Sequence, residues 1–151
     1  MLPDALLFDL TNSLQPVRRA WMKVASTVMA DLQLSTSLGT VIILISRLGP
    51  AVPQKELALE VGVNPAALVR TLDQGESAEL LKRDAVAGDR RSNTVSLLPP
   101  GKVLAEAIEQ RLVELRRALL DDLAAKDVET AQRVLRTLEM RAQNHLQRGD
   151  A

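Results

Sequence analysis

The stretch that decides the fold is PQKELALEVGVNPAALVR, residues 53–70. Its first half predicts a short helix that ends at Gly62, because glycine readily takes the left-handed conformation that closes a helix. Asn64 and Pro65 predict the start of a second helix, since asparagine caps helix N-termini and proline is favoured at the first helical position. Two short helices joined by a tight turn form a helix-turn-helix.

A small hairpin is predicted after this pair of helices. Residues 80–83 and 94–97 are short strand candidates, and the segment 85–93 between them is predicted to be a polar loop with the turn-forming Gly88. A helix-turn-helix followed by two strands is a winged helix, which we place at about residues 35–101.

A long helix is predicted before the winged region. Apolar residues recur at steps of three and four between residues 7 and 28, which favours a helix over residues 4–31. Pro16 lies inside this pattern, so we expect a kink there, or a restart of the helix with Asn12 or Ser13 as its cap.

Further helices are predicted on both sides of the hairpin. Ser35 is expected to cap a helix that ends near Arg47. The β-branched run at residues 41–45 would suit a strand on propensity alone, but the cap and the length favour a buried helix. Residues 102–147 are predicted to be helical, with a break at Lys126-Asp127.

These elements predict a mainly α fold with a small β wing, in a single domain over residues 1–151. The terminal helices, 4–31 and 102–147, carry more apolar surface than a small winged region can cover. We therefore expect them to interleave with the helices of a second chain in a homodimer. The alternative is a monomeric helical bundle.

The composition excludes several classes of function. The chain has no cysteine and one histidine, which excludes thiolate zinc sites and cysteine nucleophiles and argues against histidine metal sites and Ser-His triads. We therefore expect no enzyme, no metal and no cofactor. The longest apolar run, residues 41–45, is far shorter than the ~20 residues of a membrane span, and the start lacks a secretory pattern. We expect a cytoplasmic protein that does not enter membranes.

Several short segments follow one another in order: LS (34–35), KELA (55–58), GV (62–63), LKR (81–83), DRR (89–91), VSL (95–97) and then Gly101. In this order they resemble the MarR-type transcriptional regulators, closest to the SlyA-like branch, over about residues 30–140. The resemblance implies a homodimer on double-stranded DNA, with the second helix of each motif in the major groove and the wing at the minor groove or backbone. It also implies a small lipophilic or phenolic anion as effector, bound between the dimer helices and the winged domain.

The candidate DNA-binding residues lie on both helices of the motif and on the first strand of the hairpin. Asn64 caps a helix N-terminus whose amides can hold a phosphate. Arg70 is the basic residue of this helix and can read guanine, and Gln74, one turn further, can read adenine or bond a phosphate. Lys55 and Lys82 are candidate phosphate contacts. A solvated surface side chain is the alternative for Arg70.

The predicted wing carries further candidates. Arg90 and Arg91 lie at its tip, and a narrow, electronegative minor groove attracts arginine. Asp89 is expected to bond and aim Arg91. Taken alone, this run is also typical of an ordinary polar turn.

The effector pocket has three candidates on the first helix. Arg18, Trp21 and Met22 lie close to where members of the resembled family hold ligands. The alternatives are a tryptophan that packs in the core and an arginine that is solvated.

Two residues depart from the family pattern, because Gly75 and Glu79 stand where it carries a core leucine and a turn glycine. The helix is expected either to end at Gly75 or to continue, with Glu79 taking the chain reversal that glycine makes easily. Residues 51–101 also hold six Lys and Arg against seven Asp and Glu, a net charge of −1, so random DNA should bind poorly.

We predict a dimeric, sequence-specific DNA-binding regulator that acts as a ligand-responsive repressor. Its operator is expected to be a near-palindrome, with half-sites about one helical turn apart. The alternative is a winged-helix dimer with weakened DNA binding that acts as a protein-interaction or ligand-binding module.

Overall fold

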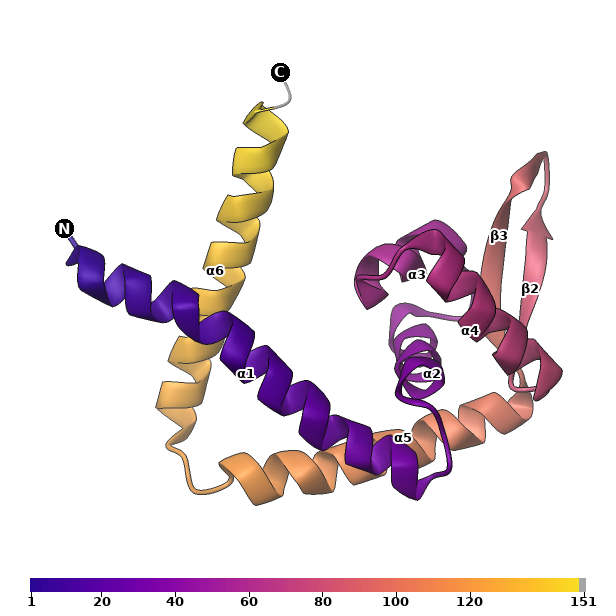
Figure 1. The fold of residues 1–151 in the computed structure, drawn as a ribbon, viewed down its shortest axis with the longest axis horizontal. Coiled ribbons are helices and arrows are strands. Elements are labelled where there is room, and N and C mark those ends of the chain that lie inside the picture. Colours follow the sequence, from indigo (N-terminus) through magenta and orange to yellow (C-terminus); the bar gives the residue numbers. More distant parts are fainter. Residues whose placement is uncertain (150–151) are drawn as a thin grey trace. The chain divides into compact units, whose positions relative to one another are not determined.

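The computed structural model describes residues 1–149, except for the side chains of Arg90 and Arg91. Within these residues the chain forms six helices and one three-stranded antiparallel sheet, which confirms the predicted mainly α fold with a small β wing (Figure 1). The chain divides into two compact units, Met1–Leu115 and the residues from Arg116 onward. The elements are α1 (Asp4–Asp31), α2 (Thr36–Leu48), β1 (Val52–Pro53), α3 (Gln54–Val61), α4 (Pro65–Ser77), β2 (Leu81–Val86), β3 (Asp89–Leu97), α5 (Pro99–Leu120) and α6 (Ala125–Gly149).

The predicted helix caps are confirmed. Ser35 Oγ accepts a hydrogen bond from the Leu38 amide at 3.2 Å, and Asn64 Oδ1 accepts one from the Ala67 amide at 2.8 Å. Gly62 ends α3 in the left-handed conformation, with φ at 72°. Each of these signals acts within one helical turn, so the sequence alone indicates it.

α1 runs through Pro16 as one helix. The alternative of a restart at Asn12 or Ser13 is therefore wrong. The Ser13 hydroxyl donates to the carbonyl of Leu10 in its own helix at 2.7 Å, so it does not cap a new one.

The hairpin is longer than predicted. β2 extends to Val86 and β3 begins at Asp89, so the expected polar loop over residues 85–93 is wrong and the turn occupies only residues 87–88. The polar residues of this segment can form paired strands because the wing is exposed to solvent. An exposed strand does not need alternating apolar residues. The short strand β1 was not predicted. It pairs with β3 through Val52 opposite Val95, in the sheet order β1-β3-β2.

α2 lies at the centre of the first unit and packs on two sides. Val41 and Ile45 belong to a cluster with α3, α4 and the sheet, whereas Ile42 and Ile43 belong to a second cluster with α1 and α5. A helix that is apolar around its circumference is a buried helix. This explains why the β-branched run at residues 41–45 forms a helix rather than a strand.

The second unit contains the end of α5 and all of α6. The predicted break at Lys126-Asp127 is wrong, because the turn lies at residues 121–124 and Lys126 and Asp127 lie in the first turn of α6. An acidic residue in the first turn is favoured by the helix dipole, so Asp127 supports a helix start. None of the described residues of α6 is buried.

No single helix within residues 1–149 is long and apolar enough to cross a membrane; α1 and α2 reach the required length and composition only as a pair, which is bent by 94°.

Candidate nucleic-acid interface

α4 has one buried and one exposed face. Leu68, Leu72 and Gly75 are buried against the rest of the winged region, whereas Arg70 and Gln74 are exposed. Residues four apart in a helix lie on the same side, so Arg70 and Gln74 share the exposed face. The two predicted base-reading residues are thus brought together on one surface.

The N-terminus of α4 is partly satisfied by its own cap. Asn64 Oδ1 binds the Ala67 amide at 2.8 Å, and the Asn64 carbonyl accepts from the Leu68 amide at 3.2 Å. Pro65 has no N–H group. Asn64 therefore acts as a structural cap. The Ala66 amide remains in the first turn as a donor to which a phosphate could bind.

α4 continues past Gly75 to Ser77, so the alternative in which the helix ends at Gly75 is wrong. The space next to this glycine is filled from the sheet. A Cβ atom at position 75 would lie 2.5 Å from Cδ2 and 2.7 Å from Cγ of Leu81, and 3.3 Å from Cδ1 of Leu38. Leu81 is 1% exposed, so this buried side chain occupies the volume that a leucine on the helix would otherwise fill.

Glu79 makes the chain reversal after α4, as expected when the helix continues. Its φ angle is 55°, in the left-handed region that glycine adopts without strain. The Leu80 amide then donates to the Gly75 carbonyl at 2.9 Å, which closes the helix end. The departures at Gly75 and Glu79 therefore leave the full length of α4 intact.

An ion-pair cluster that was not predicted joins α4 to β2. The Arg83 backbone amide donates to Glu76 Oε1 at 2.9 Å, and its Nε donates to Glu76 Oε2 at 3.1 Å. Its Nη2 also pairs with Asp73 and Glu76. Hydrogen bonds from Arg83 lower the pKa of Glu76, and hydrogen bonds to Glu76 and then Asp73 raise the pKa of Arg83. Arg83 thus positions α4 against the wing.

The remaining basic candidates differ in their surroundings. Lys82 Nζ lies 2.7 Å from Asp84 Oδ2, and both side chains are about half exposed. Lys55 and Arg70 are exposed and form no ion pair with any side chain that the structure describes. A contact from Lys82 to a phosphate would compete with its carboxylate partner, so Lys55 and Arg70 are the more available cations.

The wing candidates are described only in part. Asp89 Oδ2 accepts a hydrogen bond from the Ser92 hydroxyl at 2.6 Å, within the first residues of β3. The side chains of Arg90 and Arg91 lie outside the described part of the chain, so the expected contact between Asp89 and Arg91 stays a prediction.

The three candidate effector residues lie on the C-terminal half of α1. Trp21 is half-buried and packs against the core cluster that α1 shares with α2 and α5. Met22 is half-buried and Arg18 is exposed. The contacts of Trp21 favour the alternative of a core tryptophan, and the three residues remain candidates for an effector site.

No protein-family model matches the sequence. Among solved structures, the transcriptional regulator PA3341 is 31% identical, with a TM-score of 0.82 over 89% of this chain and 98% of that one. The transcriptional regulator BldR from Sulfolobus solfataricus is 22% identical, with a TM-score of 0.80 over 93% and 99% of the two chains. A mutant of MarR from E. coli complexed with operator DNA is also 22% identical, with a TM-score of 0.73 over 87% and 94%. Further neighbours of the same fold are MarR-family regulators.

Proposed function

The chain belongs to the MarR family of transcriptional regulators, and on this premise we propose that it is a homodimeric repressor that binds a near-palindromic operator. The observation that carries this proposal is the exposed face of α4, where Arg70 and Gln74 lie one turn apart on a helix held against the wing by Arg83. The solved structures that resemble this chain are transcriptional regulators rather than enzymes.

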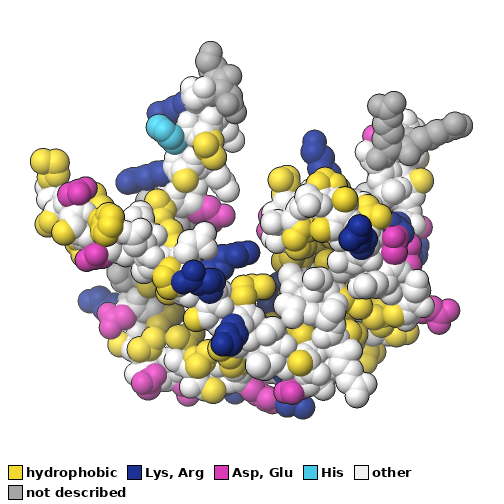
Figure 2. All heavy atoms as spheres, in the orientation of Figure 1, with side chains coloured by type: hydrophobic (Ala, Val, Ile, Leu, Met, Phe, Trp, Pro, Cys, Tyr) yellow, Lys and Arg dark blue, Asp and Glu magenta, His cyan; other side chains and the backbone are white. Residues whose placement is uncertain are grey.

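Unpartnered apolar surface on the terminal helices supports the homodimer. In α6 the side chains of Val128, Leu135 and Leu146 are 42%, 46% and 69% exposed, and none of its described residues is buried. Phe8 and Val17 on α1 are 63% and 64% exposed, and Figure 2 shows hydrophobic side chains at the surface near the N-terminus. Helices with such seams are stabilised by a second chain. We propose that the two chains of the dimer pair through the predicted dimerisation segments, about residues 4–31 and 102–147. We also propose that residues 1–151 form one domain.

The charge of the winged region supports binding through a few placed contacts. Its net charge of −1 gives little general attraction to phosphates. Arg83 and Lys82 are moreover engaged by carboxylates. Specific binding then depends on a few residues of the motif and the wing. They are Lys55, Asn64 at the N-terminus of α4, Arg70 and Gln74 on its exposed face, and Arg90 and Arg91 of the wing. Lys82 and Asp89 have supporting roles.

The test is a selection of duplexes by the native protein, followed by affinity measurements on the selected operator. Arg70→Ala should weaken binding by about 1–3 kcal/mol and relax the preference at one base of each half-site. Arg91→Ala should weaken binding by a similar amount. Ser37→Ala changes an exposed residue of α2, outside both the proposed DNA face and the proposed dimerisation segments, and should leave the affinity within twofold. If neither arginine variant changes the affinity, the proposed DNA face is refuted.

A second function, a protein-interaction or ligand-binding module with weak DNA binding, is favoured only by the acidic balance of residues 51–101. Gly75 no longer supports it, because α4 runs through this position. The two functions are separated by a mobility shift at low salt: a regulator retards a discrete genomic fragment, and the module retards none.

We also propose that the regulator responds to a small lipophilic or phenolic anion near Arg18, Trp21 and Met22, and that it acts in the cytoplasm. Arg18 is exposed next to the half-buried pair, so it can supply a charge beside an apolar surface.

A further inference from the structure

Arg70 has one charged neighbour along its own helix. Side chains three and four positions apart contact one another on a helix surface, which for Arg70 means positions 66, 67, 73 and 74. These are Ala66, Ala67, Asp73 and Gln74. An arginine and an aspartate at this spacing can form an ion pair, and such a pair would hold the guanidinium of Arg70 away from a base edge.

In the structure Asp73 pairs with a residue other than Arg70. Asp73 Oδ1 accepts a hydrogen bond from Nη2 of Arg83 on β2, and the side chain of Asp73 is 57% exposed. Arg70 forms no ion pair with any side chain that the structure describes. The charged helical neighbour of Arg70 is thus bound by a residue of the hairpin, and the guanidinium of Arg70 faces solvent.

Arg83 is held in place by a second carboxylate. Glu76 Oε2 accepts from its Nε at 3.1 Å and from its Nη2, and Glu76 Oε1 accepts from its backbone amide at 2.9 Å. The side chain of Arg83 is 22% exposed. Because the guanidinium is planar and rigid, the bonds to Glu76 also set the direction in which it faces Asp73.

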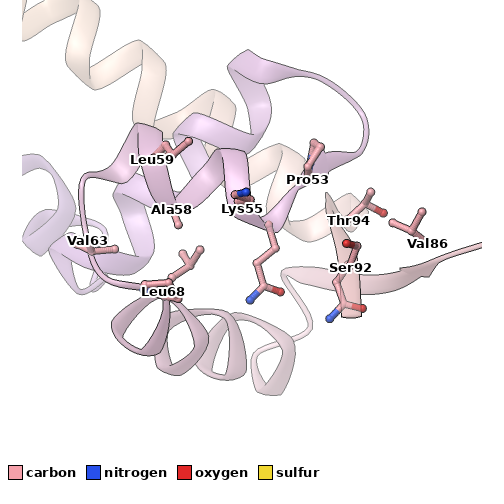
Figure 3. A pocket seen from close by; sticks show the side chains of 12 residues that line it. Pro53, Lys55, Ala58, Leu59, Val63, Leu68, Val86, Ser92 and Thr94 are labelled. Atoms are coloured by element: carbon pink, nitrogen blue, oxygen red, sulfur yellow. The ribbon is translucent and has the colours of Figure 1, made fainter. Parts of the chain in front are cut away.

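The strand that carries Arg83 is anchored next to α4. Leu81, on the same face of β2, is 1% exposed and belongs to the core cluster. Towards the tip of the hairpin, by contrast, a pocket of about 570 Å³ lies between α3 and the strands, with Ala58 on one wall and Val86 on the other (Figure 3). Arg83 thus occupies the packed end of the strand, where the core sets its position relative to α4.

We propose that Arg83 is a positioning residue for DNA recognition, because by binding Asp73 it keeps Arg70 free to read a base. Without Arg83, Asp73 pairs with Arg70, and Arg70 then reads the operator less well. The effect on the operator rests on the proposed DNA-binding function, whereas the pairing of Asp73 with Arg70 can be measured without DNA.

The first test follows the Arg70 side chain by NMR in the protein without DNA. Exchange of its guanidinium protons with water should be slower in Arg83→Met than in the native protein, and adding Asp73→Asn should restore the native rate. A pair at this spacing changes an equilibrium by about 1.5- to 2-fold, so exchange should slow by a similar factor. An unchanged rate in Arg83→Met, or a change that Asp73→Asn does not reverse, overturns the proposal.

The second test measures affinity for the selected operator. Arg83→Met should lower this affinity and relax the base preference that Arg70 supplies, and adding Asp73→Asn should restore the preference. Because a dimer carries two such pairs, Asp73→Asn should raise the affinity by about 2- to 4-fold more in Arg83→Met than in the native protein. Repulsion between Asp73 and the phosphates acts in both backgrounds, so it cancels from this comparison.

Glu76→Gln is the matched control. It also removes a carboxylate partner of Arg83 from α4, but position 76 lies about 240° around the helix from Arg70, so Glu76 cannot pair with Arg70. It should restore neither the affinity nor the base preference of Arg83→Met. If Arg83→Met does not fold, Arg83→Gln takes its place, since its amide keeps a donor for Glu76 but has no charge for Asp73.

The outcomes separate this proposal from the proposed function. An equal gain from Asp73→Asn in both backgrounds, or the same rescue by Glu76→Gln, overturns the positioning role of Arg83 while operator binding stands. If the native protein retards no DNA fragment, the proposed function is overturned, and the NMR result alone then supports or overturns the pairing of Asp73 with Arg70.

Discussion

Replacing Gly75 with alanine tests how the recognition helix accommodates its glycine. The new Cβ would lie 2.5 Å from Cδ2 and 2.7 Å from Cγ of Leu81. Leu81 is 1% exposed and belongs to the core cluster with α2, α3 and α4, so it has no free space into which to move. The substitution therefore forces a shift of either the helix or the sheet.

Two opposing contributions set the size of the effect. Alanine in a helix interior is favoured over glycine by about 1 kcal/mol. Overpacking a well-filled core costs about 1–3 kcal/mol, and a buried branched neighbour at this distance favours the upper part of that range. We therefore expect Gly75→Ala to lower the free energy of unfolding by about 1–2 kcal/mol, where an exposed helical glycine would give a gain.

Urea denaturation at fixed protein concentration measures this change. Unfolding is monitored by the fluorescence of Trp21, the single tryptophan. Gln74→Ala changes the exposed neighbour in the same helix and should alter stability by less than about 0.5 kcal/mol. In a Leu81→Ala background the clash is absent, so Gly75→Ala should there stabilise by about 1 kcal/mol. If Gly75→Ala stabilises the native protein, or has the same effect in both backgrounds, Leu81 does not fill this space and the reasoning fails.

Two further predictions concern the end of α4 and its link to the wing. Glu79→Gly should raise the free energy of unfolding by about 0.5–1 kcal/mol in urea denaturation, because it relieves a left-handed residue with φ at 55°. Ser77→Gly, at the last residue of α4, should lower it, and a loss in both variants would contradict this. Arg83→Met should cost about 1–2 kcal/mol at neutral pH, where Glu76 is ionised. Since Arg83 lowers the pKa of Glu76 from its ordinary value of 4.5, this contribution is complete above that value and disappears as the pH falls through the lower folded value. Denaturation of native and variant protein at neutral and acid pH checks it, and an equal loss at both would contradict the assignment.

The sequence determined the local features of this protein. Ser35, Asn64 and Gly62 fixed the ends of their helices, because each makes its stabilising contact or takes its special backbone conformation within one turn. The order of helix, turn, helix and hairpin was equally visible, and with it the exposed positions of Arg70 and Gln74. Local signals also failed, at Lys126 and Asp127, where charges expected to break a helix lie in the first turn of α6, and at residues 85–93, where an expected polar loop is mostly strand.

Only the tertiary structure decided which distant residues meet. Leu81 fills the space beside Gly75, and Arg83 pairs with Asp73 and Glu76 across the turn between α4 and β2. The strand β1 is only two residues long and exists through its pairing with β3. The pocket between α3 and the hairpin is likewise bounded by helix, turn and hairpin together. Such contacts depend on packing between elements, which neither helix propensity nor hydrophobic periodicity encodes.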